Sequence, residues 1–158
     1  MECSEQSPMA ISTKRMEKLT RLLFYFHDTL NPTAIRIAGP SKRSFGTTLM
    51  IDDPLTEGPE TRSKLVVRGQ GIYAIASQHD SGLLLMVMNL TFLEGTYNGS
   101  ALSILGRNPT LDKVREMPIV GGTGVFRYAR GYALAKAFSF NQKTGDAVVE
   151  YNVSVLHI

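Results

Sequence analysis

Asp28 is the residue whose position in this sequence points most directly to chemistry. It follows Leu22, Phe24 and Phe26 at two-residue spacing in the segment LLFYFHD, so in a strand its carboxyl group shares a side with those apolar groups. Burial raises the pKa of a carboxyl group and a nearby cation lowers it, and such a group can act as a general acid or base. The alternative is a strand-end aspartate that forms a turn.

Arg115 and Tyr73 are the next candidates. Arg115, in the segment KVREMP, enters a predicted strand, where a fixed guanidinium could orient or polarise a ligand oxygen. Tyr73, in GQGIY, lies in mid-strand, and its hydroxyl could hydrogen-bond a phenol. Each has an ordinary alternative, a solvated arginine and a packed tyrosine. Met50, Met86 and Met88 are either core residues or the lining of a cavity for a flat aromatic ligand, because thioethers adapt their shape.

The elements that would position these residues are strands. Apolar and polar residues alternate with a period of two, most clearly over residues 147–157, and no segment sustains a helical period. Strands are also expected at residues 34–38, 45–52, 69–77, 83–93, 99–105, 115–120 and 131–140. Turn residues separate them at 54–59, 78–82, 94–99, 121–124 and 141–145.

About eight or nine short antiparallel strands predict an all-β fold. We expect an eight-stranded antiparallel β-barrel with a central small-molecule pocket, since a barrel of this size has room for one small ligand. One domain is expected at residues 18–158, after a flexible N-terminal lead at residues 1–17.

Composition excludes several classes of protein. The 158 residues are 43% hydrophobic and 20% charged, as in ordinary single globular domains. A net charge of +3 with scattered basic residues gives no basis for binding nucleic acid. No apolar run is long enough to cross a membrane. The one cysteine, Cys3, and three widely spaced histidines show no metal-ligand pattern, and we expect neither a metal nor another cofactor.

Three glycosylation sequons bear on where the protein works. They are Asn89-Leu90-Thr91, Asn98-Gly99-Ser100 and Asn152-Val153-Ser154, each with an open central position. They favour a secreted glycoprotein. The first 20 residues are polar and contain no visible signal peptide, which favours the cytosol or a shortened N-terminus.

Several segments, in order and at matching spacing, resemble the plant dirigent proteins from about Leu19 to Ile158. The matching segments are FYFHD at 24–28, IDDPLT at 51–56, RGQGIY at 68–73, VREM at 114–117 and VGGTG at 120–124, followed by Phe126 and ARG at 129–131. The resemblance implies an eight-stranded barrel, a homotrimer, secretion to the plant cell wall space, and control of stereochemistry in phenylpropanoid chemistry. Some members couple phenoxy radicals made by a separate laccase or peroxidase into lignans. Others dehydrate or close a phenolic through a quinone methide.

By motif match, Asp28 and Arg115 take the positions of the catalytic pocket aspartate and arginine of this family. Tyr73 takes that of a pocket tyrosine. The remaining residues expected to bind substrate are Phe26, Met88, Asn108 and Val149.

Two departures separate this chain from lignan-forming members. Where those members typically have Gly-Ala-Asp, this chain has Gly106-Arg107-Asn108, and an amide cannot transfer protons at neutral pH. Cys3 also has no mate for the cysteine pair of those members. The Gly-Arg-Asn version resembles the subgroup that includes pterocarpan-forming dirigents.

Three functions stay open at this stage. The first is stereoselective phenoxy-radical coupling or quinone-methide chemistry, including a pterocarpan synthase-like isoflavanol dehydratase. The second is a non-catalytic barrel that binds an aromatic ligand, as lipocalins do. The third is a purely structural cell-wall protein.

Overall fold

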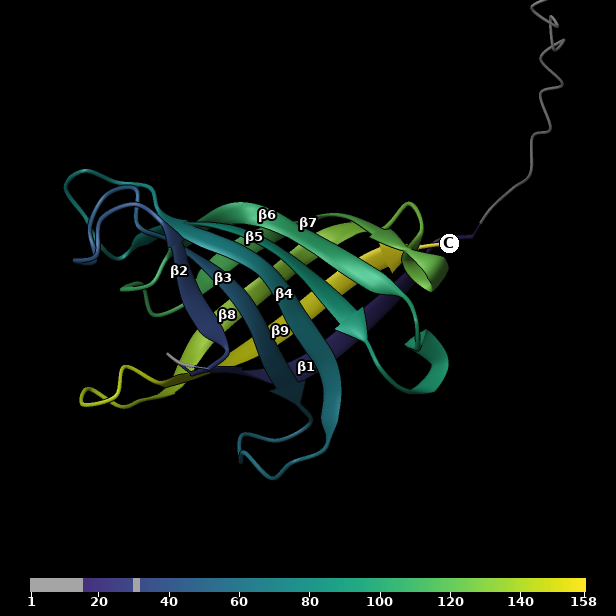
Figure 1. Ribbon diagram of the computed structural model, residues 1–158. Helices are drawn as coiled ribbons and strands as arrows, with labels where there is room; N and C mark the ends of the chain where they lie inside the picture. Colours follow the sequence, from purple (N-terminus) through teal and green to yellow (C-terminus); the bar gives the residue numbers. More distant parts are fainter. Residues whose placement is uncertain (1–15, 30–31) are drawn as a thin grey trace, which may run out of the picture.

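The structure, a computed structural model, describes residues 16–29 and 32–158 and consists of antiparallel strands and two single-turn 3₁₀ helices (Figure 1). The elements, in chain order, are β1 (Lys18–Asp28), β2 (Ala34–Ala38), β3 (Thr48–Thr56), β4 (Leu65–Ile75), β5 (Leu83–Phe92), η1 (Gly95–Tyr97), β6 (Ala101–Pro109), β7 (Arg115–Thr123), η2 (Gly124–Phe126), β8 (Arg130–Phe140) and β9 (Ala147–His157). No helix among the described residues has the length and apolar character to cross a membrane.

Eight of the nine strands close into a barrel. The strand order is β1-β9-β8-β7-β6-β5-β4-β3-β2, and a further pairing of β1 with β3, at Phe26 and Leu55, joins the two sides. The remaining strand, β2, pairs with the first half of β3 and lies beside the barrel. The predicted eight-stranded antiparallel β-barrel is thus confirmed, with one extra strand.

Pro54 lies within β3, where the sequence predicted a turn at residues 54–59. On the side of β3 that faces away from β4, the Asp52 amide donates to the Thr33 carbonyl oxygen at 2.9 Å. On the same side, pairing with β1 resumes at Leu55. The N–H groups of residues two apart point to the same side of a strand, so the backbone nitrogen of Pro54 points to the same side as that of Asp52. There it lies between the segment at Thr33 and strand β1, and its missing N–H removes no hydrogen bond from the sheet.

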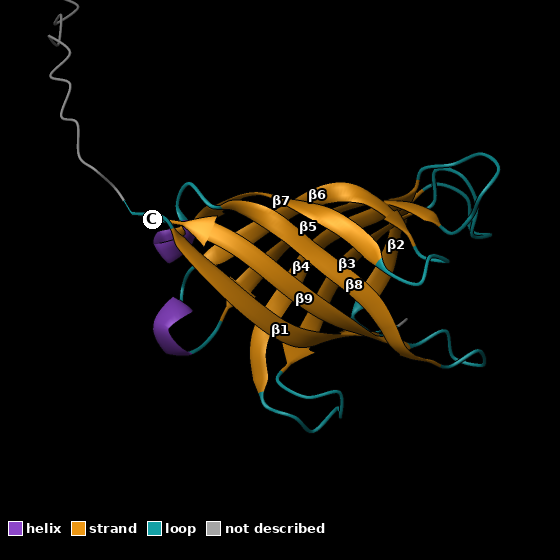
Figure 2. Ribbon diagram, turned by 180° about the vertical axis from the view of Figure 1, so that it is seen from behind, coloured by secondary structure: helices purple, strands orange, loops and turns teal. Residues whose placement is uncertain are grey.

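One end of the barrel is filled by aromatic rings. The ring centroids of Phe92 and Phe126 are 5.1 Å apart, those of Tyr97 and Phe126 4.9 Å, and those of Phe126 and His157 5.1 Å. His157 Nε2 also lies 2.9 Å from the Thr20 hydroxyl, a buried hydrogen bond. We call the four rings the aromatic plug. Both 3₁₀ helices lie at this end, near the C-terminus (Figure 2).

We call the opposite end of the barrel the mouth. It is ringed by the loops 39–47, 76–82, 110–114 and 141–146, which gather away from the C-terminus in Figure 1. Neighbouring loops are bonded together, because Thr110 donates to the Gly82 carbonyl oxygen from both its amide (2.9 Å) and its hydroxyl (2.8 Å). The polar residues that the sequence singled out lie toward this end.

Of the predicted N-terminal lead, residues 1–17, the structure describes only the last two residues. Residues 1–15, including Cys3, lie outside the described residues. Glu17, which the prediction assigned to the lead, forms an ion pair with Arg130 of β8, with 3.0 Å between Oε2 and Nη2. The chain is therefore attached to the barrel one residue before β1 begins.

Candidate active site

Arg115 and Asn108 bring buried polar groups to the mouth end of the barrel. Arg115 begins β7 and is 6% exposed, while Asn108 lies near the end of β6 and is 4% exposed. The Arg115 Nη1 donates to the Thr110 carbonyl oxygen at 3.4 Å, but its Nε has no partner among the described residues, and neither has the Asn108 Oδ1. Buried polar groups in proteins are normally bonded, so these unmet groups are suited to binding a ligand's oxygen or hydroxyl.

Asp28 ends β1 in the orientation that the alternation predicted. Phe24 and Phe26 are each 4% exposed, and the Asp28 Oδ1 is fully buried without a hydrogen-bond partner. Burial raises the pKa of Asp28, the Arg43 guanidinium partly offsets this effect, and the nearby Asp146 carboxylate adds to it. A carboxyl group with a raised pKa, partly open at the mouth, is suited to proton transfer.

Two tyrosines share this interior with Asp28. Tyr73 of β4 is 3% exposed, and burial together with the charge of Asp28 raises its pKa to about 12. Tyr151 of β9 is 2% exposed, and its pKa is raised by burial and by the charges of Asp28 and Asp53, while Arg115 lowers it. Both phenols therefore stay protonated at neutral pH and can donate hydrogen bonds to a ligand.

Tyr151 connects the two predicted catalytic residues. It interacts electrostatically with both Asp28 and Arg115. The structure shows no ion pair between Asp28 and Arg115, so neither side chain is occupied by the other. Phe26 packs against Tyr151 with ring centroids 5.6 Å apart.

The apolar residues predicted to bind substrate also face the interior. Phe26 and Met88, which are 4% and 1% exposed, approach each other across Gly69. A Cβ at Gly69 would lie 2.9 Å from Phe26 Cε2 and 3.1 Å from Met88 Sδ, so only glycine leaves these side chains their positions. Val149 is partly buried and packs against the same core. Met50, by contrast, is 44% exposed and faces outward.

Asp53 and Arg43 are polar residues of this site that sequence reasoning missed. Asp53 is 0% exposed and faces inward between Ile51 and Leu55, which share its parity and are 2% and 0% exposed. That parity was visible in the sequence, but the strand was predicted to end at residue 52. Arg43 extends from the loop 39–47 to Tyr73 and Asp28, and no local pattern pointed to it.

The three sequon asparagines are all exposed. Asn89 lies on the outer face of β5, where its Oδ1 accepts a hydrogen bond from the Ser103 hydroxyl at 2.8 Å. Asn98 follows η1, and Asn152 lies on the outer face of β9. Each position is accessible to a glycan, and whether any carries one stays a prediction.

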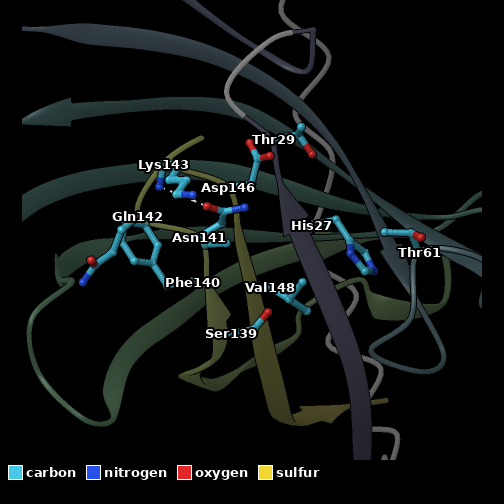
Figure 3. A pocket seen from close by; sticks show the side chains of 11 residues that line it. His27, Thr29, Thr61, Ser139, Phe140, Asn141, Gln142, Lys143, Asp146 and Val148 are labelled. Carbon is cyan, nitrogen blue, oxygen red and sulfur yellow. Dashed lines mark hydrogen bonds between the residues drawn. The ribbon is translucent and has the colours of Figure 1, made fainter.

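A pocket of about 750 Å³ lies on the outer side of the barrel rather than at its centre. Figure 3 shows His27 and Thr61 on one side of it and side chains of the β8–β9 hairpin, including Phe140 and Lys143, on the other. His27 faces outward, since it has the opposite parity to Asp28. None of the predicted site residues lines this pocket, so the central pocket remains a prediction that rests on the interior polar groups.

Comparison with known proteins places this geometry in a family. The family model described as Dirigent-like protein matches residues 19–156. The chain is 53% identical over 149 residues to Dirigent protein 21 of Arabidopsis thaliana, covering 89% of this chain and 78% of that protein. It is 51% identical over 150 residues to Pterocarpan synthase 1 of Glycyrrhiza echinata, covering 89% and 79%.

A solved structure agrees with these sequence matches. The structure of a pterocarpan synthase dirigent protein superposes with a TM-score of 0.86 at 50% identity, covering 98% of this chain and 97% of that one. Its close match includes the strands that carry the polar interior. From the sequence match, the barrel and the inward-facing polar residues together, we conclude that the chain belongs to the dirigent family.

Proposed function

We propose that this protein controls the stereochemistry of a quinone-methide reaction, closing a small phenolic alcohol to a cyclic ether with loss of water. The observation that carries the proposal is the cluster of Asp28, Tyr73, Arg115 and Tyr151 inside a barrel that is otherwise lined with apolar side chains. The similarity to proteins named pterocarpan synthase supports an isoflavanol as substrate and a pterocarpan as product.

The proposed reaction needs one acid and one base but no oxidant. The carbon–oxygen bond of the substrate's alcohol breaks, and the leaving hydroxyl takes up a proton to become water. A phenol oxygen of the same molecule then bonds to that carbon and releases a proton. Asp28 exchanges these protons, while Arg115 stabilises the charge that develops on the substrate's phenolic oxygen. Asn108, an amide, orients the substrate without exchanging protons.

The test is turnover of a racemic isoflavanol by the purified protein without any oxidase, with the products resolved by chiral chromatography. The expected result is one pterocarpan enantiomer, because a fixed arrangement of polar groups accepts only one face of the quinone methide. A racemic product or no product would remove support for this activity.

Radical coupling with an external laccase or peroxidase is the second candidate function. It is favoured by the apolar lining around Phe26 and Met88, because coupling needs mainly orientation in a dry cavity. Coniferyl alcohol with a laccase, with and without this protein, tests it: an excess of one lignan enantiomer supports coupling. A racemic product there, after no isoflavanol turnover, leaves a non-catalytic binding barrel.

We also propose that the protein forms a homotrimer through an apolar row on the outer face. Register places Ile35, Met50, Ile72, Val87 and Leu105 side by side across five strands. Four of these side chains are 36–57% exposed: Ile35, Met50, Val87 and Leu105. A contiguous exposed apolar surface of this kind is typical of a protein–protein interface.

Leu105→Glu is expected to dissociate this oligomer, because it places a charge within the buried contact. Light scattering after size-exclusion chromatography should give a mass near three times that of the chain for the wild type and a single-chain mass for the variant. Leu111→Glu is the matched control, since Leu111 is 83% exposed in a mouth loop, away from the row. A wild-type monomer would contradict the proposal.

The dirigent family is generally extracellular, and we propose secretion to the cell wall space for this chain. The exposed positions of Asn89, Asn98 and Asn152 support it, because glycan attachment requires accessible acceptors and passage through the secretory pathway. Mass spectrometry of tryptic peptides from plant-expressed protein, before and after removal of glycans by amidase, would show which of the three are occupied.

A further inference from the structure

Asp53 is a buried carboxyl group for which the proposed mechanism gives no role. It is 0% exposed, and neither of its carboxyl oxygens has a hydrogen-bond partner among the described residues. The nearby Thr33 hydroxyl lowers the pKa of Asp53, but it donates its one proton to the Thr29 carbonyl oxygen at 2.9 Å and so offsets only part of the cost of burial. A buried carboxylate without donors is costly, and this environment favours a protonated Asp53.

The pairing of β1 with β3 brings Asp53 near Asp28. The last two pairs between β1 and β3 join Tyr25 to Thr56 and Phe26 to Leu55. The β1–β3 pairing ends there, and Asp28 and Asp53 lie two residues further along each strand, near enough for the charge of Asp28 to raise the pKa of Asp53. Both face the interior, and two like charges this near each other disfavour ionisation of both groups. The two carboxyl groups are therefore expected to hold one proton between them.

The other charged and titratable groups near Asp53 do not neutralise its carboxyl group, so they do not displace the proton that it shares with Asp28. Tyr73 of β4 and Tyr151 of β9 are both uncharged at neutral pH. Arg68 of β4 is the neighbouring cation, but its Nε donates to the Asp52 carboxylate on the outer face at 2.7 Å. Burial and the charges of Asp28 and Asp52 raise the pKa of Asp53 to about 7, while Thr33 and Arg68 lower it.

We propose that Asp53 is a positioning residue that holds a proton for Asp28, so that the two carboxyl groups act as one acid–base pair. This inference rests on the proposed dehydration. Asp28 meets the substrate at the mouth, and Asp53, which is sealed from solvent, interacts electrostatically with Asp28. The pair takes the proton that the phenol releases and returns one to the leaving hydroxyl, so its charge is unchanged after each turnover.

The test compares Asp53→Asn with the wild type in the isoflavanol assay, with kcat and KM measured across pH. The wild type should lose activity as the pH rises through about 7, where the pair gives up its shared proton. Asn has nearly the shape of a protonated aspartic acid but cannot pass on a proton. We expect kcat to fall about 10²-fold with KM changed less than about 2-fold, and the falling limb near neutral pH to disappear.

Glu116→Gln is the matched control, since Glu116 is an exposed carboxylate on the outer face of β7 and should leave both kcat and the pH profile unchanged. Asp53→Asn with wild-type kcat and the wild-type falling limb would overturn the proposal. The pair can also be followed without turnover, by carbon-13 NMR of the aspartate carboxyl groups in the wild type. Two coupled titrations at Asp28 and Asp53 support the proposal even if isoflavanol dehydration fails, and two independent titrations in the ordinary aspartate range refute it.

Discussion

Asp28→Asn is expected to lower kcat for pterocarpan formation by about 10²–10⁴-fold, the usual contribution of a general acid–base group. The asparagine keeps the size and position of the side chain but neither accepts nor gives up a proton at neutral pH. Arg115, Tyr73 and Tyr151 remain to bind the substrate, so KM should change much less than kcat. The measurement is steady-state turnover of the racemic isoflavanol, with chiral analysis of the product.

Glu116→Gln is the control for Asp28→Asn, because Glu116 is an exposed carboxylate on the outer face of β7. It should keep wild-type kcat. The residual product of Asp28→Asn should keep the wild-type enantiomer in excess, since the groups that orient the substrate are untouched. If Asp28→Asn turned over within about 2-fold of the wild type, Asp28 would not be the proton-transfer group.

Asp53→Asn is expected to remove a pH-dependent loss of stability from the fold. The pKa of Asp53 is raised in the folded protein from 3.8 to about 7, so the unfolded chain ionises more readily. This group's contribution to stability is complete below the ordinary aspartate pKa and is lost as the pH rises toward 7. A difference of about 3 pKa units corresponds to about 4 kcal/mol of unfolding free energy.

Urea unfolding of both proteins from about pH 4 to pH 8 would measure this effect. The wild type should lose about 4 kcal/mol more than Asp53→Asn over that range, so the variant gains relative stability as the pH rises. Glu116→Gln, with an exposed carboxylate removed from the outer face of β7, should keep the wild-type slope. Parallel curves for Asp53→Asn and the wild type would mean that Asp53 is ionised over the whole range.

The barrel could be predicted because its strands alternate in a regular way. In β9 each apolar residue from Tyr151 to Val155 faces the interior, as a period of two requires. Strand ends were harder to predict. Pro54 was predicted to form a turn because proline has no N–H to donate to a partner strand. Among the described residues no partner strand lies beside its nitrogen, since Pro54 falls in the gap between β2 and β1. This gap exists only in the closed barrel and cannot be seen in the sequence. β6 likewise extends to Pro109, four residues beyond the predicted end.

The same boundary error explains why the site was only partly predicted. Asp28 was found because its strand continues an apolar series, whereas Asp53 lies one residue beyond a predicted strand end and was assigned to no strand. Tyr151 was assigned to the apolar face of its strand, but its electrostatic interaction with both Asp28 and Arg115 depends on pairing between distant strands. Arg43 lies on a loop without periodicity, so only the folded chain shows that it approaches Tyr73.

The aromatic plug has a consequence for the order of events in catalysis. Phe126 is 0% exposed and Phe92 4%, so the end of the barrel near the C-terminus offers no passage. Any molecule that enters the interior does so at the mouth and must leave by the same route. In the proposed dehydration, product and released water must therefore leave through the mouth before the next substrate can enter. The rate of this exit sets an upper limit on the rate of turnover.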